Sequence, residues 1–130
     1  MTFDLALLDS KSACEDGAEM ELLHPRTKQP LGAFITLRGK DSPSLRAYIS
    51  RQQNDRLEKI RRGKAINVEQ QEKDNINLLA QATTGWRGMV EDGEELPFSV
   101  SEAARVYAEF PWIEEQADAF IGDRANFLPD

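Results

Sequence analysis

The sequence has one cysteine and one histidine among its 130 residues, and this scarcity removes several kinds of chemistry from consideration. Cys14 has no second cysteine with which to form an internal disulfide, and this fits a reducing compartment. With His24 as the only histidine there is no HxxxH or CxxC spacing, so a zinc site would have to rest on carboxylates. We interpret His24 as an ordinary residue at the end of a strand, in preference to a metal ligand or a member of a Cys–His dyad.

Long apolar runs and phosphate-binding glycine loops are also missing. No run approaches the roughly 20 residues that a membrane helix needs. The N-terminus carries acids where a signal peptide has positive charge. The glycines never form GxxxxGK or GxGxxG, and acid pairs such as Glu94–Glu95 are more typical of a solvated surface than of acid–base machinery. We therefore expect a non-enzymatic protein of the cytoplasm, with no cofactor, no metal and no membrane partner.

What is present is a charge balance that changes sign along the chain, beneath a net charge of -7. Residues 40–64 contain eight Lys or Arg against three acids, whereas residues 91–130 contain eleven Asp or Glu against two Arg. Segments of opposite sign favour either pairing within the chain or head-to-tail association, so we expect homo-oligomers that respond to salt. The residues expected to carry this contact are Arg51, Arg56, Arg62, Glu94, Glu95, Glu114 and Glu115.

The apolar pattern predicts a single α+β domain over 1–130, mainly helical, with a small antiparallel β element near the N-terminus followed by about four helices. Alternation after Glu19 and a β-branched, aromatic-rich run ending at Arg38 flank a loop bounded by prolines, which indicates a β-hairpin over 19–38. A lone hairpin is marginal in water, and Phe3 to Leu8 is one candidate for a third strand. Residues 1–18 otherwise show no period and are expected to be loosely ordered or to form an edge segment.

Capping residues and a 3.6-residue period predict the helices. Asp41 or Ser42, a capping acid or hydroxyl, followed by Pro43 starts a helix that ends near Gly63. Asn67 starts a second one, giving a helical pair over 42–84. Ser99 with Glu102 fits a capping box that opens the C-terminal helices over 99–124. The predicted apolar face of the first helix consists of Leu45, Tyr48, Ile49, Leu57 and Ile60.

The run from Gly85 to Ser99 separates the basic and acidic parts of the chain, and Asp92–Gly93 within it is typical of a tight turn. Aromatic residues cluster here beside acids, which favours a partner-binding surface with an apolar centre and a charged rim. The alternative, that these residues pack the C-terminal helices together, stays open. The candidate partner-binding residues are Trp86, Leu96, Phe98, Tyr107 and Trp112.

Four runs, taken in order and spacing over residues 19–128, resemble the tail assembly chaperones of long-tailed bacteriophages. They are His24–Gly32; Gly39–Ser42; Thr84–Trp86 with Asp92–Gly93 and Leu96–Ser99; and Phe110–Gln116 with Phe120–Ile121 and Asn126–Phe127.

The resemblance implies a small, mostly helical, non-enzymatic phage or prophage protein of the host bacterial cytoplasm. Such a protein binds the tape-measure protein, helps to recruit tail-tube subunits and leaves before the virion is complete. Two alternatives remain open. One is a nucleic-acid-binding regulator using the basic helix 44–62, although a solvated helix face explains the same charges without nucleic acid. The other is a structural head–tail connector or tail-completion protein, which would stay in the virion.

Overall fold

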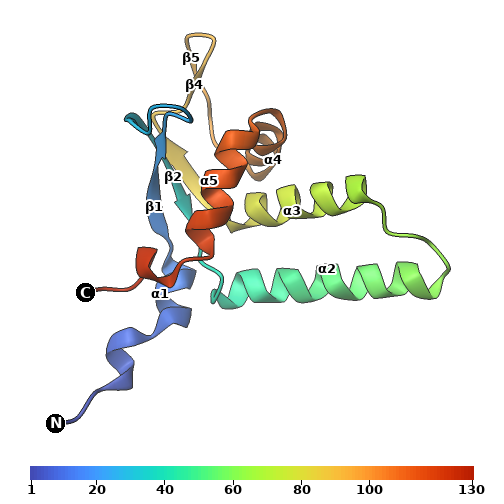
Figure 1. Cartoon of the computed structure of the whole chain (residues 1–130), viewed down its shortest axis with the longest axis horizontal. Coiled ribbons are helices and arrows are strands. Elements are labelled where there is room, and N and C mark those ends of the chain that lie inside the picture. Colours follow the sequence, from blue (N-terminus) through green and yellow to red (C-terminus); the bar gives the residue numbers. More distant parts are fainter.

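In the computed structural model, which describes residues 1–130, the predicted hairpin forms two strands of a three-stranded sheet (Figure 1). Strand β1 (Ala18–Leu23) pairs antiparallel with β2 (Pro30–Leu37), with Met20 opposite Ile35. Strand β3 (Thr83–Arg87) pairs antiparallel with the other side of β2, giving the order β1-β2-β3. The predicted fold class, a mainly helical α+β domain with a small antiparallel sheet near the N-terminus, is confirmed.

The prediction of a third strand at Phe3 to Leu8 is wrong. That segment contains the 3-10 turn η1 (Leu5–Leu8), in which no residue is buried. The third strand is β3, whose Trp86 lies opposite Ile35. Residues 3–8 lack the alternation of polar and apolar residues that is typical of a strand. Strand β3 follows helix α3 directly, so no loop in the sequence marks where it begins.

Helix α1 (Ser10–Asp16) joins the N-terminal segment to the rest of the molecule. Its Cys14 is buried against Gly39, where an added Cβ would lie only 2.4 Å from the cysteine sulfur. Its Glu15 carboxylate accepts hydrogen bonds from the Ser42 and Ser44 hydroxyls, each at 2.6 Å, and from the Ser44 amide at 2.9 Å. Because the first amides of a helix lack intrahelical partners, this carboxylate anchors α1 to the start of α2.

Helices α2 (Pro43–Arg61) and α3 (Val68–Ala82) form an antiparallel hairpin that projects away from the sheet (Figure 1). The predicted caps are confirmed: Ser42 accepts from the Leu45 amide, and Asn67 accepts from the Gln70 amide at 2.8 Å. The predicted apolar face of α2 packs only at its inner end. Leu45 is buried, whereas Leu57 and Ile60 are exposed, because the sheet and the later helices do not extend along the outer half of the hairpin.

The C-terminal part contains the short hairpin β4 (Val90–Glu91) and β5 (Glu94–Glu95), helices α4 (Val100–Glu109) and α5 (Pro111–Ile121), and the 3-10 turn η2 (Arg124–Asn126). Ser99 caps α4 by accepting from the Glu102 amide at 3.0 Å. The reciprocal half of the predicted capping box does not form, because the Glu102 carboxylate instead accepts from Arg105 at 2.9 Å.

Helices α4 and α5 cover one face of the sheet, and the core lies between these helices and the sheet. It includes Ile35 and Leu37 from β2, Leu79 from α3 and Val106 from α4, all almost fully buried. Helix α5 also closes the free edge of β1: the Gln116 side chain accepts from the Leu23 amide at 3.0 Å and donates to its carbonyl oxygen at 2.8 Å. No helix has the length and apolar character needed to cross a membrane.

The acid contacts around the start of α2 predict a loss of stability at low pH. Hydrogen bonds from Ser42 and Ser44 lower the pKa of Glu15 from 4.5 to about 2. Arg124 lowers the pKa of Asp41 from 3.8 to about 2. Both carboxyls bind protons more weakly in the folded chain, so their stabilising contribution is complete above about pH 5 and disappears as the pH falls towards 2.

We expect the urea midpoint to fall over that range, and to fall less steeply in Glu15→Gln, which has no charge to lose there. The pKa of Glu114 is raised, first by burial and then by Asp118, Glu115 and Glu72, so its protonation works in the opposite direction. Glu114 is present in wild type and in Glu15→Gln alike, so the difference between their two slopes measures the contribution of Glu15. An equal slope in wild type and Glu15→Gln would contradict the assignment.

Candidate functional site

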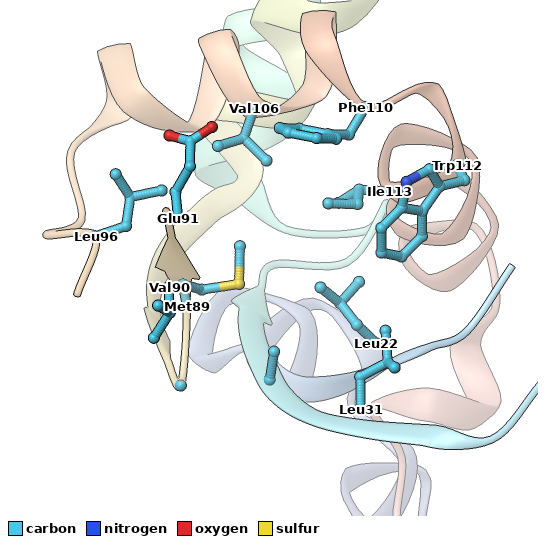
Figure 2. Close-up of a pocket in the computed structure, with 12 residues that line it drawn as sticks. Leu22, Leu31, Met89, Val90, Glu91, Leu96, Val106, Phe110, Trp112 and Ile113 are labelled. Carbon is cyan, nitrogen blue, oxygen red and sulfur yellow. The ribbon is translucent and has the colours of Figure 1, made fainter. Parts of the chain in front are cut away.

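An open, mainly apolar groove lies between the sheet, the β4–β5 hairpin and the last two helices (Figure 2). Its volume is about 230 Å³, and ten of its twelve lining residues are hydrophobic. We call this feature the apolar groove. Its lining residues are Leu22, Leu31, Ala33, Gly88, Met89, Val90, Glu91, Leu96, Val106, Phe110, Trp112 and Ile113.

The walls of the apolar groove come from segments far apart in the sequence. In Figure 2 the indole of Trp112, at the start of α5, lies on one side and Met89 lies on the other. Leu31, from β2, and Val90, from β4, also line it, with exposed fractions of 45 % and 62 %. Apolar side chains that stay this accessible at the mouth of a concavity are typical of a surface that another molecule covers.

Two tight turns place the β4–β5 hairpin beside the groove. Asp92 and Gly93 both have positive φ, 52° and 82°, which confirms the predicted tight turn between Glu91 and Glu94. Gly88 joins β3 to β4 with φ of 73°, and a Cβ at this position would lie 2.5 Å from the carbonyl oxygen of Gly32. Only glycine fits so close to the β2 backbone, so the direction of the hairpin depends on this residue.

Arg105 of α4 holds the hairpin against the helix. Its guanidinium donates to Glu91 at 2.8 Å, to Glu102 at 2.9 Å and to Glu109 at 3.0 Å. The hydrogen bonds to Glu91 and Glu102 raise the pKa of Arg105. One cation facing three carboxylates leaves net negative charge on this side of the groove, where Glu91 is the only charged lining residue. We call the acids of residues 91–95 the acidic rim.

Of the five residues predicted to bind a partner, Leu96 and Trp112 line the apolar groove. Tyr107 lies in the core: its side chain is 1 % exposed and its hydroxyl is 2.7 Å from the Thr83 hydroxyl. Burial raises the pKa of Tyr107 to about 12, against the opposing effect of the hydrogen bond to Thr83. Tyr107 therefore presents no surface to a partner in this structure.

Trp86 and Phe98 do not line the apolar groove, and they contact each other and the segment that carries Leu96. The Trp86 indole N–H donates to the Leu96 carbonyl oxygen at 2.8 Å, and its ring meets Phe98 edge to face with centroids 5.1 Å apart. Both side chains are half-buried and pack against the core. Their position indicates a role in holding the Leu96–Phe98 segment.

The three arginines predicted to mediate self-association already have partners within the chain. Arg56 donates to Asp74 of α3 at 3.0 Å, and Arg62 donates to Glu58 at 3.2 Å. The Arg51 guanidinium lies 5.8 Å from the centre of the Tyr48 ring. Pairing of Arg56 with α3 turns it towards the inside of the hairpin, which also reduces the support for a phosphate-binding surface on this helix.

The four acids predicted for self-association lie in two places. Glu94 and Glu95 form β5 and are exposed at the tip of the short hairpin. Glu114 and Glu115 lie on α5, and the pKa of Glu114 is raised first by burial and then by the nearby acids Asp118, Glu115 and Glu72. Each pair adds negative charge to its own part of the surface.

Sequence reasoning missed most of the apolar groove. Leu22 and Leu31 belong to the predicted hairpin. Met89 lies within the run from Gly85 to Ser99, and Phe110 begins the run to Gln116, but nothing local shows that these residues meet. The pairing of Glu91 with Arg105, fourteen residues apart, was also missed. The available signal was the apolar pair Met89–Val90, which lies one residue before the two-residue turn Asp92–Gly93.

The residues that were weighed for chemistry have local structural contacts. His24 Nδ1 accepts from the amides of Arg26 and Thr27, at 3.1 and 3.2 Å, and so stabilises the turn between β1 and β2. Cys14 is buried. No group of three or more His, Cys, Asp or Glu side chains is arranged to hold a metal ion.

Comparison of the chain with protein-family models, curated proteins and solved structures finds no match.

Proposed function

We propose that this chain is a non-enzymatic assembly chaperone that holds an apolar, basic-flanked segment of a longer protein in the apolar groove. The observation that carries the proposal is the groove itself, with its accessible Leu31 and Val90 and its acidic rim. Peptide-binding grooves of this kind bury the apolar face of an amphipathic helix, and a rim of one charge selects flanking residues of the other.

The resemblance of four runs to phage tail assembly chaperones identifies the client class in this proposal. The client is the tape-measure protein, a long chain whose apolar helical stretches would aggregate if left uncovered, and tail-tube subunits are the second partner. The chaperone acts in the host bacterial cytoplasm and is absent from the finished virion. An acidic surface supports this role because it keeps the chaperone in solution while the apolar groove covers the client.

The test is binding of peptides tiled across the tape-measure protein, followed by fluorescence anisotropy with wild type and Val90→Lys. Val90 is exposed and lies opposite Glu95 on β5, so a lysine there faces a carboxylate and leaves the short hairpin intact. The new charge lies in the apolar lining and repels a basic-flanked client. We expect at least one peptide to bind wild type, and Val90→Lys to bind it at least about tenfold more weakly.

Val100→Ala is the matched control, because Val100 is also exposed and does not line the groove. It should bind like wild type. Equal binding by Val90→Lys, or no bound peptide anywhere along the tape-measure protein, would contradict the proposal. Detection of the chain in purified virions would favour the connector alternative, and salt-sensitive DNA or RNA binding would favour the regulator.

A further inference from the structure

The outer half of the α2–α3 hairpin carries apolar side chains that no other part of the chain covers. Leu57 and Ile60 are 61 % and 54 % exposed. Residues spaced by three or four positions share one side of a helix, so Leu57 and Ile60 form one apolar strip on α2. We call these two residues the hairpin ridge.

The segment of sequence that contains the hairpin ridge is positive, although Asp74 of the neighbouring helix α3 faces Lys59. Residues 57–66 contain four cations and a single acid, Glu58. Arg61 and Arg62 both approach that one carboxylate, at 3.5 and 3.2 Å, so positive charge remains unneutralised around the ridge. The four cations are Lys59, Arg61, Arg62 and Lys64.

The apolar groove has the complementary properties. The groove can receive apolar side chains, and Leu57 and Ile60 are apolar side chains that remain accessible. Residues 89–96, which form one wall, contain four acids and no cation, and the neighbouring Arg105 is shared among three carboxylates. Complementary charge around complementary apolar surfaces favours association in one orientation.

The hairpin ridge cannot reach the groove of its own chain. The nineteen residues of α2 span about 28 Å. Figure 1 shows the α2–α3 turn at the far end of the molecule from the β4–β5 hairpin and α5. A contact between the two surfaces therefore requires two molecules.

We propose that the hairpin ridge of one copy docks in the apolar groove of a second copy. Leu57 and Ile60 enter between the β4–β5 hairpin and α5, and Arg61 and Arg62 face the acidic rim. Because two different surfaces meet, each copy keeps one free ridge and one free groove, and the association continues as an open chain. The inference rests on the proposed function in one respect: the client needs the same groove, so client binding displaces the neighbouring copy.

The decisive experiment is complementation between two variants, followed by sedimentation velocity. Leu57→Glu combined with Ile60→Glu removes the ridge, and Val90→Lys blocks the groove; all three positions are exposed, and circular dichroism checks that the fold is retained. Wild type is expected to form larger species as concentration rises and smaller ones as salt rises. Each variant alone should associate at least tenfold more weakly. An equimolar mixture should form a dimer that grows no further. Its one intact ridge and its one intact groove are already bound to each other, and the surfaces left free are the altered ones.

Leu5→Glu is the control, since Leu5 is 81 % exposed and lies on neither surface; it should associate like wild type. Three results would overturn the inference: a wild type that stays monomeric at all concentrations, a ridge or groove variant that associates normally, or a mixture that yields no dimer.

Displacement is tested with a synthetic amphipathic helical peptide of leucine and lysine, which has the chemistry of the proposed client. Adding the peptide to wild type should convert the oligomers into monomers with bound peptide. Oligomers that stay assembled while they carry the peptide would show that ridge and client use different sites. That result would overturn the proposal that both use the apolar groove. Tape-measure peptides that bind a strictly monomeric protein would overturn this inference alone. Self-association without any tape-measure binding would overturn the proposed function alone.

Discussion

Trp86→Ala is expected to lower the free energy of unfolding by about 3 kcal/mol, at the lower end of the range for truncating a packed aromatic side chain. The side chain is half-buried, so the loss is smaller than for a fully enclosed tryptophan. Its removal takes away the edge-to-face contact with Phe98 and leaves the Leu96 carbonyl oxygen without its 2.8 Å donor. Urea unfolding followed by circular dichroism measures the change.

Trp112→Ala is the matched comparison, because Trp112 is also half-buried but its indole lines the apolar groove. We expect it to lose more client affinity and less stability than Trp86→Ala. The comparison separates the two roles that the sequence left open for these tryptophans. A Trp86→Ala protein that unfolds within about 1 kcal/mol of wild type and yet fails to bind the client would make Trp86 a contact residue instead.

Gly88→Ala is expected to have a similarly large effect, about 3 kcal/mol, through the backbone. A residue with a side chain at φ of 73° is strained, which costs roughly 1–2 kcal/mol. The added Cβ would also meet the Gly32 carbonyl oxygen at 2.5 Å and the Ala33 Cα at 3.3 Å, both backbone atoms that cannot rotate away. The β3–β4 connection must shift, so we expect client affinity to fall as well.

Gly93→Ala gives the backbone cost alone. Gly93 has φ of 82°, but no atom lies within 4 Å of the position of its Cβ, so only about 1 kcal/mol is expected. Thermal unfolding of the two variants side by side measures the contribution of the close approach at Gly88. Equal losses would show that the contact with Gly32 is relieved at little cost and that the hairpin direction does not depend on it.

The parts of the fold that were predicted from the sequence are those with local causes. The loop bounded by prolines marks the β1–β2 hairpin, and Ser42 and Asn67 mark helix starts because their side chains bond amides three residues ahead. Asp92–Gly93 marks a turn because both residues accept positive φ. Each of these features is decided within about four residues.

The parts that were missed depend on distant packing. Strand β3 contains a glycine and follows α3 without a loop, so its pairing with β2 is decided only when the sheet assembles. The 3.6-residue period of α2 places Leu45, Leu57 and Ile60 within one half of the helix circumference, but a period does not say what covers each turn. The apolar groove needs strands, a hairpin and two helices at once, so only Leu96 and Trp112 of its lining were identified as partner-binding candidates.

The contact between Gln116 and Leu23 has a consequence for solubility during high-level synthesis. An unprotected edge strand is a template for pairing with another chain, and natural proteins block such edges. Here the Gln116 amide imitates a neighbouring strand at the free edge of β1, using one acceptor and one donor. The same helix carries Trp112 one turn earlier, so the helix that covers the sheet edge also forms one wall of the groove. Loss of Gln116 would therefore expose an aggregation-prone edge in a protein whose proposed task is to keep another chain from aggregating.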